Sequence, residues 1–288
     1  MPVKVIYSEK FLEYEEPGHP ESPTRLRSVA DLLQKKKDSF EFIPPVPCEE
    51  KDLLLVHTPD LVRRVKENDF FDPDTPNLNN IYSYALLSCG AAIQAAYMAL
   101  DGELSFSLGR PPGHHAGKNT MGGFCYFNGM AVAVKKILQE RKLKIAVLDI
   151  DGHHGNGTEE ILRGEDGVIY VSLHQSPAFP GTGTVSFENC YNFPVLPGAE
   201  AKDYMDKFAE ALGIIETFSP DLLGISAGFD AHRRDPLLNL PLEDTHYYGI
   251  GKELGGTKRK IFSVMEGGYN IKTIGNTCYC FISGLAKR

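Results

Sequence analysis

The sequence predicts one α/β domain over residues 1–288, with a doubly wound and mostly parallel sheet. Short apolar segments of strand length alternate with longer segments of helical periodicity along the whole chain. Several of the short segments are almost uninterruptedly apolar, as expected for parallel strands that are buried on both faces. No linker, internal repeat or low-complexity stretch divides the 288 residues, and a single α/β domain of this size is ordinary.

Local signals delimit the elements of the first half of the chain. Pro23 opens a helix, and Thr58 followed by Pro59 is typical of a helix N-terminus. Asp101-Gly102 ends a long alanine-rich helix. The predicted elements are a strand at Val3–Tyr7, helices at Pro23–Leu33, from Pro59 and at Ile81–Leu100, a strand at Glu103–Leu108 and a helix at Asn128–Glu140.

The second half repeats the alternation of strands and helices. The segment KIAVLDI is nearly continuous in apolar residues and predicts a central strand. The predicted strands are Lys144–Ile150, Val168–Leu173, Asp221–Ser226 and Ile261–Val264, and the helices are Ala201–Phe218, Glu243–Leu254 and a last one from about Ile271 to Leu285.

The composition excludes several classes of protein. Hydrophobic residues make up 42% and charged residues 24%, as in an average soluble protein. The formal net charge of −8 does not attract nucleic-acid phosphates, so we expect no nucleic-acid partner. We find no run of about 18 apolar residues that could span a bilayer, and Glu9 and Lys10 interrupt any signal-peptide core. The six cysteines form no CxxC pair, so we expect reduced thiols in a cytoplasmic protein without a membrane partner.

Polar residues capable of chemistry follow four of the predicted strands. These segments read RPPGHHAG, DGHHGNGT, GFDAH and EGGYN. In open α/β sheets, ligands bind outside the carboxyl ends of the strands. The sequence therefore predicts that these four segments meet at one site.

A metal site is predicted within two of these segments. Asp149, Asp151 and His153 alternate at spacings of two, which on an extended segment puts them on one side. Asp230 could supply a further ligand from another strand end. Two carboxylates and one histidine leave positions open for water and substrate, as in catalytic zinc sites, and Fe²⁺ or Co²⁺ suits the same ligands. The alternative is that Asp151 and His153 only form turn hydrogen bonds.

Adjacent histidines in a loop rich in Gly and Pro suggest acid–base chemistry. His114 and His115 each need a partner on the far ring nitrogen, and Asp149 and Asn156 are available. An aspartate raises the pKa of a histidine more than a neutral asparagine does, so the pair is expected to be unequal. A second metal site is the alternative.

Three aromatic residues lie next to glycine-containing turns. Tyr269 comes after Gly267-Gly268 and could donate a hydrogen bond to a developing oxyanion. Phe124 follows Gly122-Gly123, and Phe179 precedes Pro180-Gly181, so two rings could wall a slot for an aliphatic chain. For each ring taken alone, packing in the core is an equally good explanation.

Together the motifs RPPGHHA, GGFCYFNG, VLDIDGHHGNGT, VSLHQSPAFPGTG, AGFDAH and EGGYN resemble those of the histone deacetylase family. This family belongs to the arginase/deacetylase superfamily, which includes acetylpolyamine amidohydrolases and acetoin-utilisation proteins. The similarity runs from GHPESPTRLR to NTCYCFISGL, and Asn156 resembles class II and prokaryotic members. The resemblance implies an arginase/deacetylase-like fold.

The resemblance also implies roles for the site residues. It implies a zinc ion held by Asp151, His153 and Asp230, with His115 as general base and then acid and His114 as its electrostatic partner. Asp149 would support His114, Asn156 would support His115, and Tyr269 would polarise the acetamide carbonyl. The implied substrate contacts are Phe124, Phe179, Gly123 and Leu237 along an acetyl-lysine tunnel and Asp74 at its rim. The implied potassium ligands are Asp149, Ser172 and the carbonyls of Asp151, His153 and Leu173.

We therefore expect a monomeric, metal-dependent amidohydrolase that removes the acetyl group from acetyl-lysine in a peptide or protein. An apolar Leu237 beside Arg233-Arg234 disfavours a polycation. One alternative is a deacylase of small acetylated amines such as acetylpolyamines, and another is a non-catalytic protein that binds acetylated ligands. Arginase-type hydrolysis would need an Asp-rich two-metal site, which His114-His115 does not match.

Overall fold

The computed structural model describes residues 2–287 and contains one eight-stranded parallel sheet. Its strand order is β2-β1-β3-β8-β7-β4-β5-β6. The strands are β1 Val3–Ile6, β2 Phe40–Ile43, β3 Ser105–Ser107, β4 Ile145–Asp149, β5 Val168–Gln175, β6 Cys190–Val195, β7 Leu222–Ala227 and β8 Lys260–Met265. The interior strands β4, β5, β7 and β8 are buried along almost their whole length, which explains their largely apolar sequences.

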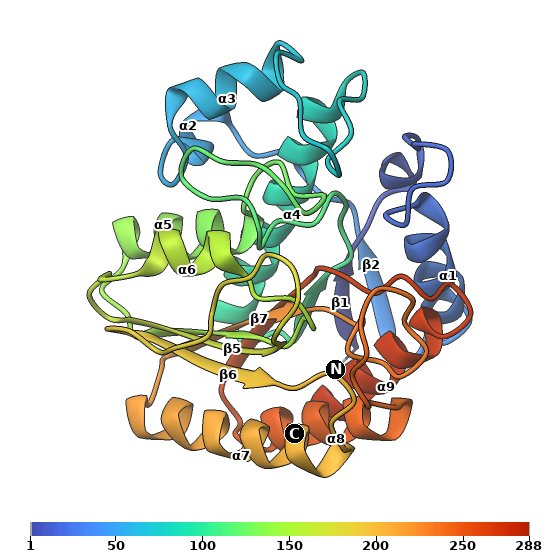
Figure 1. Ribbon diagram of the computed structural model, residues 1–288, viewed down its shortest axis with the longest axis vertical. Helices are drawn as coiled ribbons and strands as arrows, with labels where there is room; N and C mark the ends of the chain where they lie inside the picture. Colours follow the sequence, from blue (N-terminus) through green and yellow to red (C-terminus); the bar gives the residue numbers. More distant parts are fainter. Residues whose placement is uncertain (1, 288) are drawn as a thin grey trace.

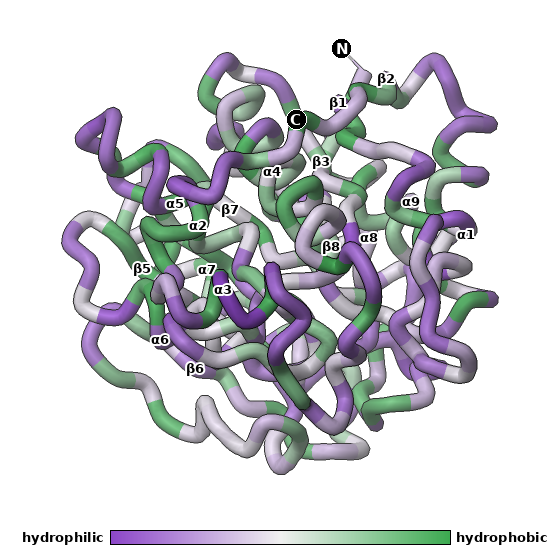
Figure 2. Tube along the Cα trace, turned by 90° about the horizontal axis from the view of Figure 1, so that it is seen from above, coloured by the Kyte–Doolittle hydropathy of each residue, from purple (hydrophilic) through white to green (hydrophobic). Residues whose placement is uncertain are grey.

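Helices cover both faces of this sheet (Figure 1). One layer contains α4 Ile81–Leu100, α5 Gly129–Glu140 and α6 Asn156–Leu162, and the opposite layer contains α7 Ala201–Phe218, α8 Asp244–Gly256 and α9 Ile274–Leu285. The remaining helices are η1 Glu9–Leu12, α1 Pro23–Gln34, α2 Glu50–Leu53 and α3 Pro59–Lys66. Hydrophobic segments gather in the interior and hydrophilic ones lie mostly at the periphery (Figure 2). The predicted doubly wound α/β fold is confirmed.

The sequence analysis missed both edge strands of the sheet. β2 has the sequence FEFI, in which only the first residue is fully buried, so it lacks a continuous apolar run. β6 has the sequence CYNFPV, and its proline is tolerated because it lies at an edge of the sheet. The short helices η1, α2 and α6 were missed too, since each is seven residues or fewer.

Helix α4 corrects the statement that no segment is long and apolar enough to span a membrane. Its 20 residues contain no charged side chain and pass that test by length and composition. In the fold, 61% of the apolar window is buried, and α4 packs against β8 and α5. Its apolar character is thus accounted for by packing on the sheet.

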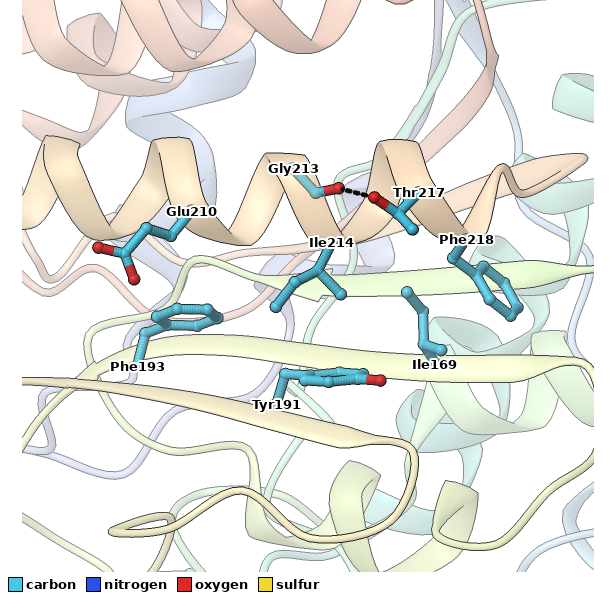
Figure 3. A pocket seen from close by; sticks show the side chains of 8 residues that line it. All are labelled: Ile169, Tyr191, Phe193, Glu210, Gly213, Ile214, Thr217 and Phe218. Carbon is cyan, nitrogen blue, oxygen red and sulfur yellow. Dashed lines mark hydrogen bonds between the residues drawn. The ribbon is translucent and has the colours of Figure 1, made fainter.

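An apolar cavity of about 640 Å³ lies between α7 and the strands β5 and β6 (Figure 3). Ile169, Tyr191, Phe193, Ile214 and Phe218 contribute most of its apolar lining. None of the sequence-predicted site residues lines this cavity. The chemistry of the protein is therefore sought elsewhere, at the carboxyl ends of the strands.

A buried charge cluster joins the N-terminal segment to the loop that follows β3. Arg110 makes a bidentate ion pair with Glu21, with nitrogen–oxygen distances of 2.6 and 2.7 Å, and Arg25 reaches the same carboxylate at 2.9 Å. All three side chains are at most 5% exposed. Burial alone would raise the pKa of Glu21, but the Arg110 guanidinium outweighs it and lowers that pKa. The carboxylate is therefore ionised between two guanidinium groups.

We expect Glu21→Ala to lower the free energy of unfolding by about 3–5 kcal/mol, because it leaves two buried guanidinium groups without their carboxylate. Equilibrium urea denaturation measures the loss. Glu15→Ala, at an exposed neighbouring glutamate, is the control and should change stability by less than about 0.5 kcal/mol. A Glu21→Ala protein as stable as this control would show that the cluster contributes nothing to folding.

Candidate active site

The four polar segments predicted from the sequence follow four adjacent strands. In the sheet, β3, β8, β7 and β4 are consecutive neighbours, and all of them run parallel. Their carboxyl ends therefore lie at the same edge. This arrangement brings the loop with His114 and His115 together with Asp151, Asp230 and the segment that carries Tyr269.

Asp151, His153 and Asp230 form a buried cluster in which one potential ligand atom from each residue lies within 4.8 Å of the other two. His153 Nδ1 is 2.7 Å from Asp230 Oδ2 and 3.2 Å from Asp151 Oδ1. The second oxygen of each carboxylate accepts a backbone N–H, from Gly152 at 2.6 Å for Asp230 and from Gly267 at 2.7 Å for Asp151. The backbone thereby aims one oxygen of each carboxylate at His153.

The electrostatics of this cluster suit a divalent cation. Burial and the neighbouring Asp151 carboxylate raise the pKa of Asp230 to about 7. Burial would lower the pKa of His153, but the Asp230 and Asp151 carboxylates raise it to about 10. Two carboxylates and one imidazole nitrogen are the ligand types of catalytic zinc sites, and Fe²⁺ or Co²⁺ accepts them as well. The donor set thus fits one divalent ion.

One detail of the metal-site prediction was wrong. β4 ends at Asp149, and residues 151–153 form a bend rather than an extended continuation of the strand. Asp149 does not belong to the cluster. Its Oδ1 accepts the N–H of Asp151 at 3.1 Å, and its Oδ2 accepts hydrogen bonds from His114 and Tyr170, each at 3.0 Å.

The two histidines lie with ring centroids 4.0 Å apart and have different partners. His114 Nδ1–H donates to Asp149 Oδ2 at 3.0 Å, and His115 Nδ1–H donates to Asn156 Oδ1 at 2.8 Å. Both rings are nearly buried. With Nδ1 protonated, a neutral His115 presents an unprotonated Nε2 that can accept a proton.

The same surroundings separate the pKa values of the pair. Burial would lower the pKa of His114, but the Asp151 and Asp149 carboxylates raise it to about 10. Burial and the positive charges of His114 and His153 lower the pKa of His115 well below its usual value. At neutral pH, His114 is therefore a cation and His115 a neutral base.

The histidine pair and the cluster of Asp151, His153 and Asp230 form the floor of the site. Three aromatic rings lie around this floor. Phe179, which is 47% exposed, packs edge-on against His115 at 5.0 Å between centroids. Phe124 packs edge-on against Tyr269 at 5.5 Å. Burial keeps the pKa of Tyr269 well above its usual value, so its hydroxyl stays protonated and available as a donor. A Cβ at Gly123 would lie 2.3 Å from the His115 ring, so only glycine fits there.

The loop around Phe124 is strained and braced by the segment with Asp74. Phe124 has φ +69°, a conformation that costs a bulky residue about 1–3 kcal/mol. Asp74 Oδ1 accepts the N–H of Gly123 at 3.2 Å, and Thr75 Oγ1 accepts that of Phe124 at 3.0 Å. Asp74 is half-buried beside this loop, with one oxygen engaged by the Gly123 amide. That it binds a substrate backbone stays a prediction.

The remaining predicted residues lie nearby. Leu237 is 41% exposed, and its N–H donates at 3.0 Å to Asp235 Oδ1, on the carboxylate whose other oxygen accepts the N–H of Tyr269. Ser172 pairs in register with Asp149 on the neighbouring strand, and its hydroxyl lies 2.8 Å from His174 Nδ1. Leu173 follows Ser172 and is fully buried. Potassium binding by Asp149, Ser172 and the carbonyl of Leu173 stays a prediction.

Two buried carboxylates near the site were missed by the sequence analysis. Asp235 Oδ2 accepts the N–H of Tyr269 at 2.7 Å. Glu266 Oε2 accepts the N–H of Gly113 at 2.7 Å. A lone acid whose partners are backbone amides leaves no spacing pattern, so only its place next to a catalytic motif could have drawn attention to it.

Comparison with known proteins agrees with this geometry. A profile of the histone deacetylase domain matches residues 19–285. The chain belongs to the histone deacetylase family. The resemblance inferred from the motifs is thereby confirmed.

Members of the histone deacetylase family with different names resemble the chain. A probable deacetylase from Archaeoglobus fulgidus is 34% identical, with 93% of this chain and 81% of the relative covered. Acetylpolyamine amidohydrolase 2 from Pseudomonas aeruginosa is 31% identical over 78% of this chain and 71% of its own length. The crystal structure of the HDA15 HD domain superposes with a TM-score of 0.90 at 34% identity, covering 99% of this chain and 91% of that one.

We expect Asp230→Ala to abolish metal retention, because it removes one of the three convergent ligands and exposes the charge of Asp151. The measurement is metal content by atomic emission after dialysis against zinc, iron(II) or cobalt. Asp206→Ala, at an exposed carboxylate paired with Lys202, is the matched control and should bind metal like the native protein. Stoichiometric metal in the Asp230→Ala protein would show that the ligand assignment is wrong.

Proposed function

We propose that the protein hydrolyses the acetamide of acetyl-lysine in peptides or proteins. The observation that carries this proposal is the unequal histidine pair beside a buried three-ligand cluster, under a rim of aromatic rings. In this pair His115 supplies a base and His114 a fixed cation, and their rings are in contact. Hydrolysis of an unactivated amide needs both, together with a donor for the carbonyl oxygen.

Asp151, His153 and Asp230 would hold one divalent ion, zinc being our first choice, which when bound polarises the amide carbonyl and lowers the pKa of a water molecule. His115 accepts the proton of the attacking water at Nε2. It later donates this proton to the nitrogen of the departing lysine amine. Asn156 keeps the proton on Nδ1 throughout, so that Nε2 always faces the reaction.

His114 and Tyr269 act on the charge that develops during this reaction. His114 stays protonated through neutral pH and offsets the negative charge that accumulates beside His115. Tyr269 donates its hydroxyl hydrogen to the amide oxygen as that oxygen becomes negative. The backbone of Tyr269 is held by Asp235, so its hydroxyl can be aimed without rearrangement.

The second candidate is hydrolysis of acetylpolyamines. It is favoured by the relative of that name from Pseudomonas aeruginosa and by two half-exposed acids at the rim, Asp72 and Asp74. Acting against it are Leu237, which offers no charge to a second ammonium group, and the exposed Arg234. A panel of acetylated peptides and N-acetylated polyamines distinguishes the two candidates by kcat/KM.

Removing only the hydroxyl of Tyr269 tests its proposed role in the reaction. Tyr269→Phe should lower kcat by about 100-fold or more and leave KM nearly unchanged, as for the loss of one oxyanion donor. Steady-state kinetics on an acetyl-lysine peptide measure both constants. Tyr247→Phe is the control, because that buried hydroxyl has no hydrogen-bond partner among residues 2–287 and its removal therefore breaks no bond. A full-rate Tyr269→Phe enzyme would return the residue to a packing role.

Charge at the rim tests the choice of substrate. The native enzyme should prefer acetyl-lysine peptides, and Leu237→Glu should shift the kcat/KM ratio toward acetylpolyamines by about tenfold, equivalent to about 1.4 kcal/mol. A carboxylate about 4 Å from an ammonium group contributes 1–4 kcal/mol, depending on exposure. Leu237→Gln, similar in size but uncharged, is the control. A native enzyme that already favours acetylpolyamines would replace our proposal with the second candidate.

A further inference from the structure

Glu266 is a buried carboxylate to which the proposed chemistry assigns no task. It is the first residue after β8 and only 1% exposed. No lysine or arginine forms an ion pair with its carboxylate among residues 2–287. A buried carboxylate without a cationic partner is unfavourable unless hydrogen bonds compensate it. Its surroundings therefore have to supply those bonds.

Three neutral donors surround this carboxylate. Oε2 accepts the backbone N–H of Gly113 at 2.7 Å and that of His114 at 3.2 Å, and Oε1 accepts the Ser226 hydroxyl at 3.2 Å. Two of the donors belong to the loop that carries His114 and His115. The third lies on β7, next to the strand from which Glu266 comes. The carboxylate thus ties the histidine loop to the centre of the sheet.

The backbone of the same residue belongs to the segment that carries Tyr269. The carbonyl of Glu266 accepts Arg25 Nη2, and that of Gly268 accepts Arg25 Nε, both at 2.6 Å. The Arg25 guanidinium lies 4.7 Å from the centre of the Tyr269 ring. One residue therefore connects the histidine loop on one side with the segment of Tyr269 on the other.

We propose that Glu266 is a positioning residue that sets the histidine loop relative to Tyr269. The inference rests on the deacetylation chemistry proposed above and extends it. Because its contacts run to backbone amides, Glu266 fixes where the loop lies, while Asp149 and Asn156 orient the two rings. The length of the side chain then matters more than its charge.

Two substitutions separate length from charge. Glu266→Gln keeps the length, since its Oε1 can accept both amides and its Nε2 can donate to Ser226. Glu266→Asp keeps the charge, but its carboxylate is shorter by one C–C bond, about 1.5 Å, and no longer reaches the amides. Ser263→Ala is the control for β8, because the Ser263 hydroxyl is buried without a hydrogen-bond partner among residues 2–287.

The kinetic experiment compares these three variants with the native enzyme on one acetyl-lysine peptide. We expect Glu266→Gln and Ser263→Ala to retain kcat within about threefold. Glu266→Asp should lower kcat by about 100-fold with little change in KM, the size of effect expected for a misplacement of about 1 Å. Bound metal should stay the same in all three variants. A Glu266→Asp enzyme with native kcat, or a Glu266→Gln enzyme as slow as Glu266→Asp, would overturn the proposal.

A second measurement needs no turnover. Proton NMR records the imidazole Nδ1–H that His114 donates to Asp149. We expect this resonance to shift or broaden in Glu266→Asp and to stay in place in Glu266→Gln, and an unchanged resonance in both would contradict the proposal. If Glu266→Asp does not fold, Ser226→Ala takes its place, because it removes one of the three donors to the Glu266 carboxylate. We expect a smaller shift of the His114 Nδ1–H resonance in Ser226→Ala. An unshifted resonance in this variant would contradict the proposal as well. A native protein inactive on every acetylated substrate would refute the proposed function and leave this test valid.

Discussion

Burial of several carboxylates at one edge of a parallel sheet is the constraint on which the rest of the site depends. Asp149, Asp151, Asp230 and Glu266 are each at most 1% exposed and lie at the ends of three adjacent strands or just beyond them. A buried charge needs hydrogen bonds or an opposite charge. Each of these carboxylates accepts at least one backbone N–H, and for three of them the N–H comes from a segment that follows a different strand. Compensating the charges therefore also joins the loops to one another.

The difference between the two histidines follows from the same constraint. His114 lies between two carboxylates, so its positive charge is held in place, whereas His115 faces the amide oxygen of Asn156 and the ring of His114. Adjacent residues with identical side chains thereby acquire different protonation states at neutral pH. Such a division suits the proposed chemistry, because a general base has to be unprotonated and a neighbouring cation can offset the negative charge that develops beside it. The fold achieves this division with two aspartates beside His114 and one asparagine beside His115.

How far the sequence could predict the structure depended on which atoms make each contact. The central strands were predicted because burial on both faces leaves a continuous apolar run, while FEFI and CYNFPV at the edges carry no such signal. The histidine partners Asp149 and Asn156 were predicted because both lie in VLDIDGHHGNGT, one of the motifs that carry the family resemblance. Glu266 was not predicted, since its partners are two amides and a hydroxyl more than 35 residues away. Contacts to the backbone leave no trace in residue types.

The floor and the rim of the site are built under different constraints, and this separates chemistry from specificity. Every carboxylate of the floor is held by buried hydrogen bonds, so a substitution there leaves charges or amides without partners. Phe179 and Leu237 at the rim are 47% and 41% exposed, so their side chains can change with little effect on folding. Relatives named deacetylase and acetylpolyamine amidohydrolase can therefore share one fold. On the function that we propose, the floor sets the type of bond that is cleaved, and the rim sets which acetylated amine enters the site.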